Sequence, residues 1–213
     1  TLMRNFAVPF FSRDIAEFWR RWHISLNTWF RDYLYIPIGG SQGKMMYKIR
    51  NIFIIFIVSG FWHGANWTFI AWGFLNALYF IPLMIRNKNR QFLGTVAAGK
   101  LVPTINDFIR ILTTFSLTTF AFIFFRSDSV REAIYYIRGA VVRPGFSIPE
   151  ELTITAVITI STMLVIEWIQ REKSHGLEIS KLPRAMRWSI YMPIALIISM
   201  MAGEKVSFIY FQF

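Results

Sequence analysis

A long apolar run over residues 49–85 constrains the fold most strongly, because a histidine, His63, interrupts it near the middle. A helix needs about 20 apolar residues to cross the hydrocarbon core of a bilayer, so one unbroken helix of this length would overshoot it. Gly60 and Gly64 flank the histidine, and we expect them to mark a break with a helix on either side. The pattern therefore predicts that His63 lies at a helix break at membrane depth.

A histidine in this setting is a candidate reaction centre. Non-helical backbone at membrane depth is tolerated where it is buried in protein or lines a wet cavity, and a titratable side chain there is usually functional. Trp62, Asn66 and Trp67 are close to His63 in sequence, and we expect them to shape its pocket. The alternative is structural: His63 would then hydrogen-bond a neighbouring helix or cap the break.

The composition favours an all-helical integral membrane protein. Hydrophobic residues make up 54% of the chain, and the absence of cysteine excludes disulfides and thiol catalysis. A formal charge of +11 is also found in nucleic-acid-binding proteins, but here the basic residues cluster between apolar runs. That arrangement is typical of segments that face anionic headgroups, so we expect membrane lipid as a partner and no nucleic acid.

The N-terminal segment has the pattern of an amphipathic helix at the membrane interface. We expect Ser12 to be its N-cap and Pro37, Gly39 and Gly40 to end it in a turn. The apolar and aromatic residues that recur at three- and four-residue steps are Ile15, Trp19, Trp22, Leu26, Trp29 and Tyr33. Another face carries Arg20, His23, Asn27 and Arg31. This face is either a ledge that binds the phosphates of a substrate, or part of an ordinary membrane anchor.

Further apolar runs predict membrane spans over residues 105–125, 152–169 and 188–202, in addition to helices over 52–62 and 66–85. Lysine and arginine are frequent in the loops 86–104 and 170–187, which places both loops on the cytoplasmic side. We expect the aromatic tail KVSFIYFQF to pack back onto the bundle. We interpret residues 1–213 as a single membrane domain, with an interfacial segment over 1–48 and membrane helices over 49–213.

The residue types leave few kinds of chemistry open. The sequence has no G-x-S-x-G motif, no Ser-His-Asp spacing and no cluster of metal ligands, so we expect no metal site. His175 lies in a basic loop, where we expect it to be solvated. A buried His63 would be neutral near pH 7 and able to accept a proton, which is what acyl transfer from a thioester to an alcohol requires. A transporter or scaffold that uses His63 as a relay or binding residue is the alternative.

Two long motifs carry a family resemblance. FSRDIAEFWRRWHISLNTWFRDYLYIPIGG and VSGFWHGANWTFIAWGFLNALYF resemble the core of the membrane-bound O-acyltransferase (MBOAT) family, and specifically its bacterial alginate O-acetyltransferase branch. The terminal FIYFQF resembles the ending of that branch. The resemblance implies an MBOAT-like bundle of many helices, with interfacial and broken ones among them. It also implies that this chain is the C-terminal part of a longer protein.

The resemblance also implies roles for individual residues. The essential histidine of the family's WHG motif falls on His63, and the histidine of its WHISL motif falls on His23. The RDYLY segment falls on residues 31–35, which makes Asp32 a candidate substrate-binding residue beside Arg31. Arg20 and Asn27 belong to the same candidate set.

The implied activity is acyl transfer from a cytoplasmic thioester, through a tunnel that contains the catalytic histidine, toward an acceptor across the membrane. In the alginate-like branch this means O-acetylation of an exopolysaccharide, handed on through a separate extracytoplasmic acetyltransferase. Acetyl-CoA or an acyl-carrier protein would be the donor, with no tightly bound cofactor. The location would be the bacterial inner membrane, with several passes.

Overall fold

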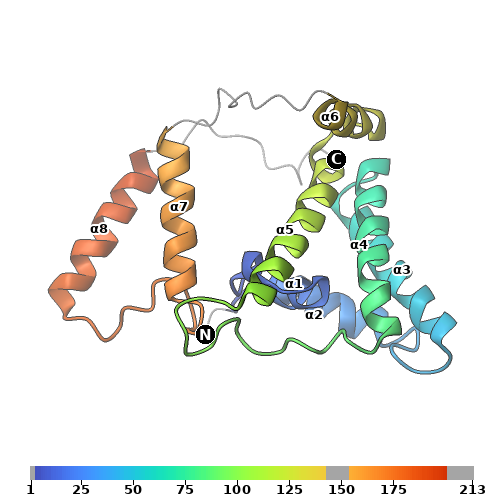
Figure 1. The fold of residues 1–213 in the computed structure, drawn as a ribbon, viewed down its shortest axis with the longest axis horizontal. Helices are drawn as coiled ribbons and strands as arrows, with labels where there is room; N and C mark the ends of the chain where they lie inside the picture. Colours follow the sequence, from blue (N-terminus) through green and yellow to red (C-terminus); the bar gives the residue numbers. More distant parts are fainter. Residues whose placement is uncertain (1–2, 143–153, 201–213) are drawn as a thin grey trace.

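The computed structural model of the chain describes residues 3–142 and 154–200, and every regular element in these ranges is helical (Figure 1). In chain order the elements are η1 (Pro9–Phe11), α1 (Ile15–Arg21), α2 (Ile24–Phe30), the π-helical η2 (Arg31–Tyr35), α3 (Met45–His63), α4 (Trp67–Ile85), α5 (Ile105–Arg126), α6 (Val130–Val142), α7 (Ile154–Ile169) and α8 (Arg184–Met200). The predicted all-α class is confirmed.

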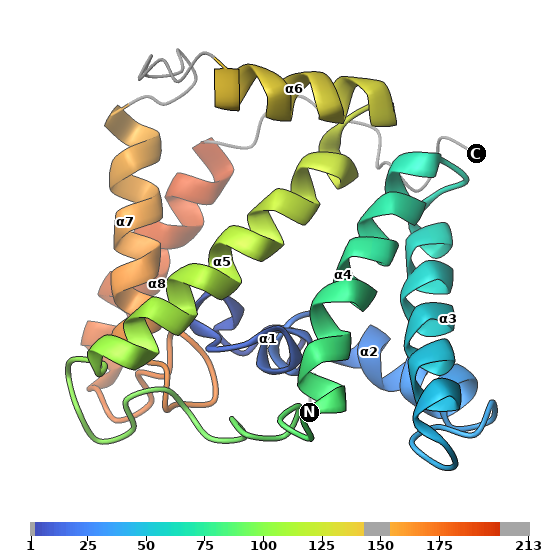
Figure 2. The same cartoon turned by 45° about the vertical axis from the view of Figure 1, so that its right-hand side comes forward.

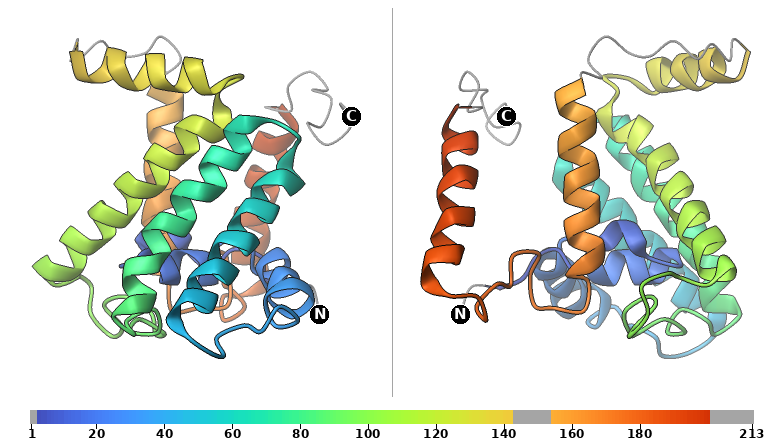
Figure 3. Two further views of the ribbon diagram at one scale, coloured as in Figure 1. Left: turned by 90° about the vertical axis from the view of Figure 1, so that its right-hand side faces the viewer. Right: turned by 60° about the vertical axis from the view of Figure 1, so that its left-hand side comes forward.

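Three of these helices, α3, α4 and α5, are long and apolar enough to cross a membrane, and α7 is a shorter apolar helix. In Figure 2, α3 and α4 run side by side as an antiparallel hairpin, and α5 leans against the end of α4. The helix α6 lies across that same end of the bundle, whereas α1 and α2 lie between the ends (Figures 2 and 3). The architecture is therefore that of an all-helical membrane protein.

The predicted break at His63 is confirmed, but its position in the bundle differs from the prediction. His63 is the last residue of α3, and Gly64 follows it with a φ of 152°. Helices α3 and α4 contain 19 residues each, so each can cross a bilayer without the other. The break therefore joins two candidate spans at a hairpin turn, and does not interrupt one span at mid-depth.

Gly60 has a different role from the predicted one. It lies inside α3, and a Cβ atom added there would be 2.3 Å from the carbonyl oxygen of Phe69 in α4. Gly73 in α4 has the reciprocal position, with 2.3 Å to the carbonyl oxygen of Phe56. Small residues of this kind let the backbones of two membrane helices approach closely. Gly60 therefore packs the hairpin, and only Gly64 acts at the break.

The prediction of one continuous N-terminal helix is wrong. The chain leaves helical geometry after α1, and His23 adopts the left-handed conformation with a φ of 43°. The amide of Asn27 donates hydrogen bonds to the carbonyl oxygens of Trp19, at 2.7 Å, and of Trp22. A side chain that caps the last carbonyls in this way ends a helix, and the amphipathic spacing gives no sign of it.

The predicted N-cap is also wrong by two residues. Asp14 caps α1, because its carboxylate accepts a hydrogen bond from the backbone N–H of Glu17 at 2.6 Å. The hydroxyl of Ser12 instead donates to the carbonyl oxygen of Pro9 at 2.7 Å, which closes η1. Both residue types suit an N-cap, so the local sequence does not decide between them.

The first half of the aromatic stripe packs into the bundle. The ring of Trp19 lies 5.5 Å from that of Phe56 in α3 and 5.6 Å from that of Trp72 in α4, measured between centroids. The ring of Trp22 lies 5.7 Å from that of Phe122 in α5. These partners lie within the three candidate spans, so α1 crosses the bundle inside their length.

The second half of the stripe does not pack in this way, because Trp29 is 51% exposed and Tyr33 is 69% exposed. The predicted turn after them is confirmed: Gly39 and Gly40 have φ values of 103° and 52°, which favour glycine.

The two basic loops that the sequence places on one side of the membrane are adjacent in the structure. The guanidinium of Arg171 donates to the carbonyl oxygen of Val96 at 3.0 Å and to that of Ala97 at 2.8 Å. Trp168 donates from its indole N–H to the carbonyl oxygen of Leu101 at 2.8 Å. The tail at 205–213 and the ends of the predicted spans at 152–153 and 201–202 lie outside the described residues.

Candidate functional site

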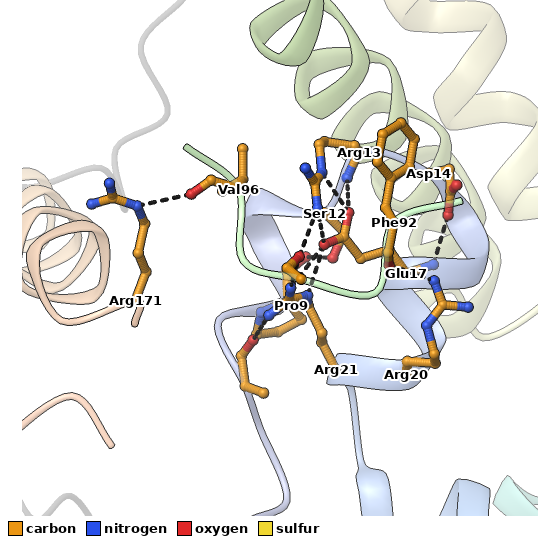
Figure 4. A network of polar contacts seen from close by, with 12 residues as sticks. Pro9, Ser12, Arg13, Asp14, Glu17, Arg20, Arg21, Phe92, Val96 and Arg171 are labelled. Atoms are coloured by element: carbon orange, nitrogen blue, oxygen red, sulfur yellow. Dashed lines mark hydrogen bonds and ion pairs between the residues drawn. The ribbon is translucent and has the colours of Figure 1, made fainter. Parts of the chain in front are cut away.

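The site rests on a buried ionic network that fixes α1 (Figure 4). Glu17 is only 1% exposed, and its carboxylate accepts hydrogen bonds from Arg13 at 3.0 Å and Arg21 at 2.8 Å. Both arginines also donate to the carbonyl oxygen of Gly94, at 2.7 and 2.9 Å. Because a buried carboxylate needs such partners, the network ties α1 to the loop between α4 and α5.

Arg20 binds the same loop between α4 and α5 and also lines a cavity. Its guanidinium donates to the carbonyl oxygens of Asn89 at 2.7 Å and Phe92 at 2.9 Å. Burial lowers the pKa of Arg20 from its ordinary value, yet a guanidinium stays charged at neutral pH. Arg20 therefore brings a fixed positive charge to the cavity wall.

The cavity has a volume of about 520 Å³ and lies between α1, α2, α3 and the end of α4. Its basic lining residues come from four different segments, and none of the described residues that line it is acidic. These basic residues are Arg20, Arg31, Lys48 and Arg90. Apolar side chains, including Ile52 and Phe80, line the remainder. A cavity with this lining can hold a ligand that has both an anionic group and an apolar part.

An aromatic layer separates this cavity from His63. Trp19 and Phe56 line the cavity, whereas His63 does not. The indole N–H of Trp19 donates to the Asn76 amide oxygen at 3.2 Å, and Asn76 in turn donates to the carbonyl oxygen of Trp72 at 2.8 Å. Trp72 is 2% exposed and contacts the rings of both Trp19 and His63. We call Trp19, Phe56 and Trp72 the aromatic layer.

On the other side of the aromatic layer, His63 is half-buried among aromatic rings. Its ring centroid lies 4.9 Å from that of Phe125 in α5, 5.0 Å from that of Trp62 and 5.4 Å from that of Trp72. Three helices thus hold one imidazole in a largely apolar setting. Such a setting restricts the ring's orientation and limits the access of water.

The structure brings the two motif histidines near each other. His23 is half-buried at the junction of α1 and α2, and its ring is stacked on Phe6 at 6.2 Å. It is close enough to His63 for an electrostatic interaction between the two imidazoles. Burial lowers the pKa of His23 from its ordinary value of 6.5, so its ring is neutral at pH 7.

The other residues predicted around His63 have different positions. Trp62 contacts the His63 ring and lies 6.5 Å from Phe30, between ring centroids. Asn66 caps α4: its amide oxygen accepts from the backbone N–H of Thr68 at 3.1 Å, and its NH₂ donates to the carbonyl oxygen of Asp128 at 3.0 Å. Trp67 is 78% exposed. Asn66 therefore supports the turn, and Trp62 borders the histidine.

The predicted basic ledge is reproduced in part. Arg20, Asn27 and Arg31 line the cavity together, but His23 does not. Asp32 is also absent from the lining, and it forms an exposed ion pair with Arg31 at 2.7 Å.

Comparison with known proteins identifies the family of this chain. The model of the MBOAT, membrane-bound O-acyltransferase family matches residues 3–126, which is more than half of the chain. The chain belongs to the membrane-bound O-acyltransferase family. The matched region contains His23, His63 and the whole lining of the cavity.

Several relatives are similar to this chain. It is 37% identical over 144 residues to a peptidoglycan O-acetyltransferase of Helicobacter pylori, covering 68% of the chain and 26% of the relative. It is 40% identical over 131 residues to a probable alginate O-acetylase, AlgI, of Pseudomonas aeruginosa, covering 62% and 23%. A teichoic acid D-alanyltransferase of Streptococcus thermophilus is 41% identical over 81 residues, covering 35% and 20%. The chain thus spans about a quarter of the length of the first two.

Several residues of this candidate site are not among those predicted from the sequence. Lys48 and Arg90 are two of them, and both line the cavity. Trp72 and Phe125 surround His63 but belong to long apolar runs, in which nothing distinguishes them from lipid-facing aromatics. Their signal appears only when the antiparallel order of α3, α4 and α5 is known.

Proposed function

We propose that this chain is the acyl-transferring part of a multi-pass bacterial inner-membrane O-acetyltransferase. It passes acetyl groups from a cytoplasmic thioester donor toward an exopolysaccharide such as alginate. The supporting comparisons are relatives named as peptidoglycan O-acetyltransferase and alginate O-acetylase. The observation that carries the proposal is the arrangement of a basic cavity on one side of the aromatic layer and the His23–His63 pair on the other.

The cavity fits the donor. Acetyl-CoA and the prosthetic arm of an acyl-carrier protein both combine phosphate with a long, less polar thioester arm. Guanidinium groups bind phosphate with charge-assisted hydrogen bonds, and Arg20 and Arg31 supply them in this cavity. The relative that transfers D-alanine keeps the acyl-carrier alternative open as a donor class.

In the proposed reaction, His63 is the general base. Neutral His63 accepts the proton from the acceptor hydroxyl as the oxygen attacks the thioester carbonyl carbon. A C–O bond forms, the C–S bond breaks, and His63 returns the proton to the departing thiolate. His23 assists by orienting or polarising the His63 ring, and Asn66 holds the turn on which His63 lies. General base catalysis of this kind contributes roughly 10²- to 10⁴-fold.

The later steps need a second protein in this proposal. A separate extracytoplasmic acetyltransferase then moves the acetyl group from this acceptor ester to a polysaccharide hydroxyl, which forms the new ester bond and releases the acceptor with its hydroxyl restored. Exposed Trp62 contacts the ring of His63, and exposed Trp67 begins α4 after the turn; both would border the incoming acceptor. Asp32 would orient Arg31 toward the donor through their ion pair.

A transporter or scaffold that uses His63 as a relay is the rival. Transporters of that kind place a broken helix near mid-membrane. In this structure two complete candidate spans meet at a turn after His63. That geometry gives the rival less support, and consumption of the thioester separates the two functions directly.

The decisive experiment compares cells that express the protein, its His63→Ala variant and its His175→Ala variant, with membrane levels matched by immunoblot. The His63 variant should lose acetyl esters on the secreted polysaccharide and the consumption of labelled acetyl-CoA by membranes. The His175 variant should keep both, since that residue lies in the loop between α7 and α8. Unchanged esters in the His63 variant would refute the general-base role, and movement of intact thioester without consumption would favour the transporter.

A further inference from the structure

The amphipathic helix α6 has no role in the proposed chemistry, yet its placement is tightly built. It follows α5 after a turn of three residues, 127–129. The backbone N–H of Glu132 donates to the Ser129 hydroxyl at 3.2 Å, and the Glu132 carboxylate accepts from the backbone N–H of Asp128 at 3.0 Å. This reciprocal capping fixes the start of the helix. As a result α6 lies across the end of α5 and α4, and does not extend α5 (Figures 2 and 3).

The side chains of α6 are arranged in stripes around its axis. Ala133 is completely buried against the bundle, while Ile134 and Val141 are 55% and 74% exposed. Ile134 and Val141 are seven residues apart, so they share one stripe, about 100° around the helix from Ala133. One side of α6 therefore packs on α4 and α5, and the adjacent apolar stripe of Ile134 and Val141 is exposed.

The next stripe around the helix is basic. Arg131 and Arg138 are also seven residues apart, and each lies three or four residues from Ile134, about 60° beyond the apolar stripe. The one carboxylate of α6, that of Glu132, lies further round and is engaged in the cap. Gly139 occupies the side opposite Val130, and a Cβ added there would contact nothing within 4 Å.

The order of these stripes favours a lipid surface as the neighbour of α6. A helix lying across the end of membrane spans, with an apolar stripe beside its protein contact and arginines next to that stripe, has the pattern of an interfacial helix. Arginine side chains reach from the hydrocarbon boundary to lipid phosphates, and tyrosines such as the exposed Tyr135 and Tyr136 are frequent at that level. A protein partner would not require this coincidence with the ends of the spans.

We propose that α6 lies in the surface of an anionic bilayer, with Ile134 and Val141 in the hydrocarbon boundary and Arg131 and Arg138 at the phosphates. The helix is connected to the His63 turn, because Asp128 at its base accepts the hydrogen bond from Asn66. The lipid surface therefore stabilises the turn that carries His63. The lipid contact itself does not depend on the proposed function.

The test uses the absence of cysteine in the chain, which allows single-cysteine labelling without a prior substitution. Val141→Cys and Gly139→Cys, two exposed positions on opposite sides of α6, each receive a bimane label. The protein is reconstituted in vesicles of phosphatidylethanolamine and phosphatidylglycerol. We expect nitroxide-bearing lipid to quench the label at 141 several-fold more than the label at 139, and aqueous iodide to show the reverse order.

Each other result overturns the proposal. Equal iodide quenching at both positions would place α6 in water, and protection at 141 from both quenchers would show that protein covers the stripe. The charge is tested by adding Arg131→Gln and Arg138→Gln to Val141→Cys. Lipid quenching should be weaker in phosphatidylcholine vesicles than in anionic vesicles, and the double substitution should abolish that difference. A difference that persists without the arginines would refute their role.

Discussion

The two sides of the aromatic layer differ in the kind of side chain that they carry. On the cavity side, Arg20 is held by the carbonyl oxygens of Asn89 and Phe92, and three more basic side chains share the lining. On the other side, aromatic rings from three helices contact His63, and the imidazole of His23 interacts with it electrostatically. The difference shows how one bundle can gather basic side chains on one side of an aromatic layer and enclose a histidine in aromatic rings on the other.

Physical chemistry explains why these tasks are kept apart. Guanidinium groups near a base would disfavour its protonated form and so weaken it as a proton acceptor. Aromatic neighbours fix the ring and exclude water but add no net charge. The buried Asn76 holds the dividing layer, because it accepts from Trp19 and donates to the backbone of Trp72. Single substitutions can therefore disturb one side of the layer at a time.

The largest effect should come from the network under the cavity. Glu17→Gln removes the carboxylate that Arg13 and Arg21 share, and it leaves two guanidinium groups short of a buried counter-charge. Breaking a buried pair by removing one partner costs about 3–5 kcal/mol. We expect that loss in the free energy of unfolding, measured in detergent by tryptophan fluorescence.

The matched control is Asp32→Asn, which removes the acidic partner of an exposed ion pair. Exposed pairs contribute little because water and salt screen them, so the stability should not change measurably. Equal losses from the two substitutions would mean that the Glu17 network is not a support of the fold.

The packing of the histidine side depends on the close approach of α3 and α4. Gly60→Ala places a methyl group 2.3 Å from the carbonyl oxygen of Phe69, so the helices must separate. Overpacking of this kind costs about 1–3 kcal/mol. Because Gly60 is one helical turn before His63, we also expect activity to fall. Thermal unfolding and acetyl transfer on the same preparation measure the two effects.

Gly139→Ala is the control for this substitution, since its added methyl group meets open space in α6. Alanine is favoured over glycine in a helix by roughly 0.5–1 kcal/mol, so this variant should be neutral or slightly more stable. Destabilisation by both variants would argue that helix propensity, and not the contact with Phe69, decides the outcome.

The sequence predicted two of the candidate spans closely, because length and hydrophobicity are local properties. The predicted spans over 152–169 and 188–202 fall on α7 and α8, which are not among the candidate spans in the described residues. The predicted helix over 66–85 is observed as α4, Trp67–Ile85, and the predicted span over 105–125 as α5, Ile105–Arg126. It failed where a contact with another part of the chain decides the geometry. Gly60 suggests a helix break in the sequence, but in the structure it allows α3 and α4 to pack closely. The end of α1 at Arg21 is accompanied by hydrogen bonds from the amide of Asn27 to the carbonyl oxygens of Trp19 and Trp22.

In the candidate site, too, the sequence predicted what local motifs encode and missed what the fold brings together. The motifs identified His63 and His23, and the structure places the two imidazoles within electrostatic reach of each other. The cavity could not be predicted, because Lys48 and Arg90 meet Arg31 from segments far apart in sequence. Asn66 was expected to shape a pocket, but its hydrogen bonds show that it caps α4 and ties the turn to Asp128.

A moderate effect should follow from loss of charge in the cavity. If the cavity binds a phosphate-bearing thioester, Arg31→Gln should raise the KM for acetyl-CoA by roughly tenfold, since hydrogen bonds to charged groups contribute about 1.5–3 kcal/mol. The kcat should change little because Arg31 lines the cavity and His63 does not. Initial rates against acetyl-CoA concentration in reconstituted vesicles measure both. Arg138→Gln, outside the cavity, should leave the KM unchanged; a similar rise there would point to a general loss of surface charge.

The smallest effect concerns pH and the histidine side. Burial lowers the pKa of His23 below its ordinary value of 6.5, so the unfolded chain binds a proton before the folded one does. The free energy of unfolding should therefore decrease as the pH falls below about 6.5, until the folded pKa is reached. His23→Asn tests this, because asparagine tolerates the left-handed conformation and does not titrate.

The useful quantity is the difference between the wild-type and His23→Asn stability profiles from pH 7.5 to 4.5. Asp14 titrates with the opposite sign, since burial raises the pKa of its carboxyl group, and its contribution is common to both proteins and cancels. A wild-type profile that declines more steeply between pH 6.5 and 5 would confirm that His23 is held neutral. Parallel profiles would mean that its ring is solvated in the folded protein, and would remove the case for a pair of neutral imidazoles beside the aromatic layer.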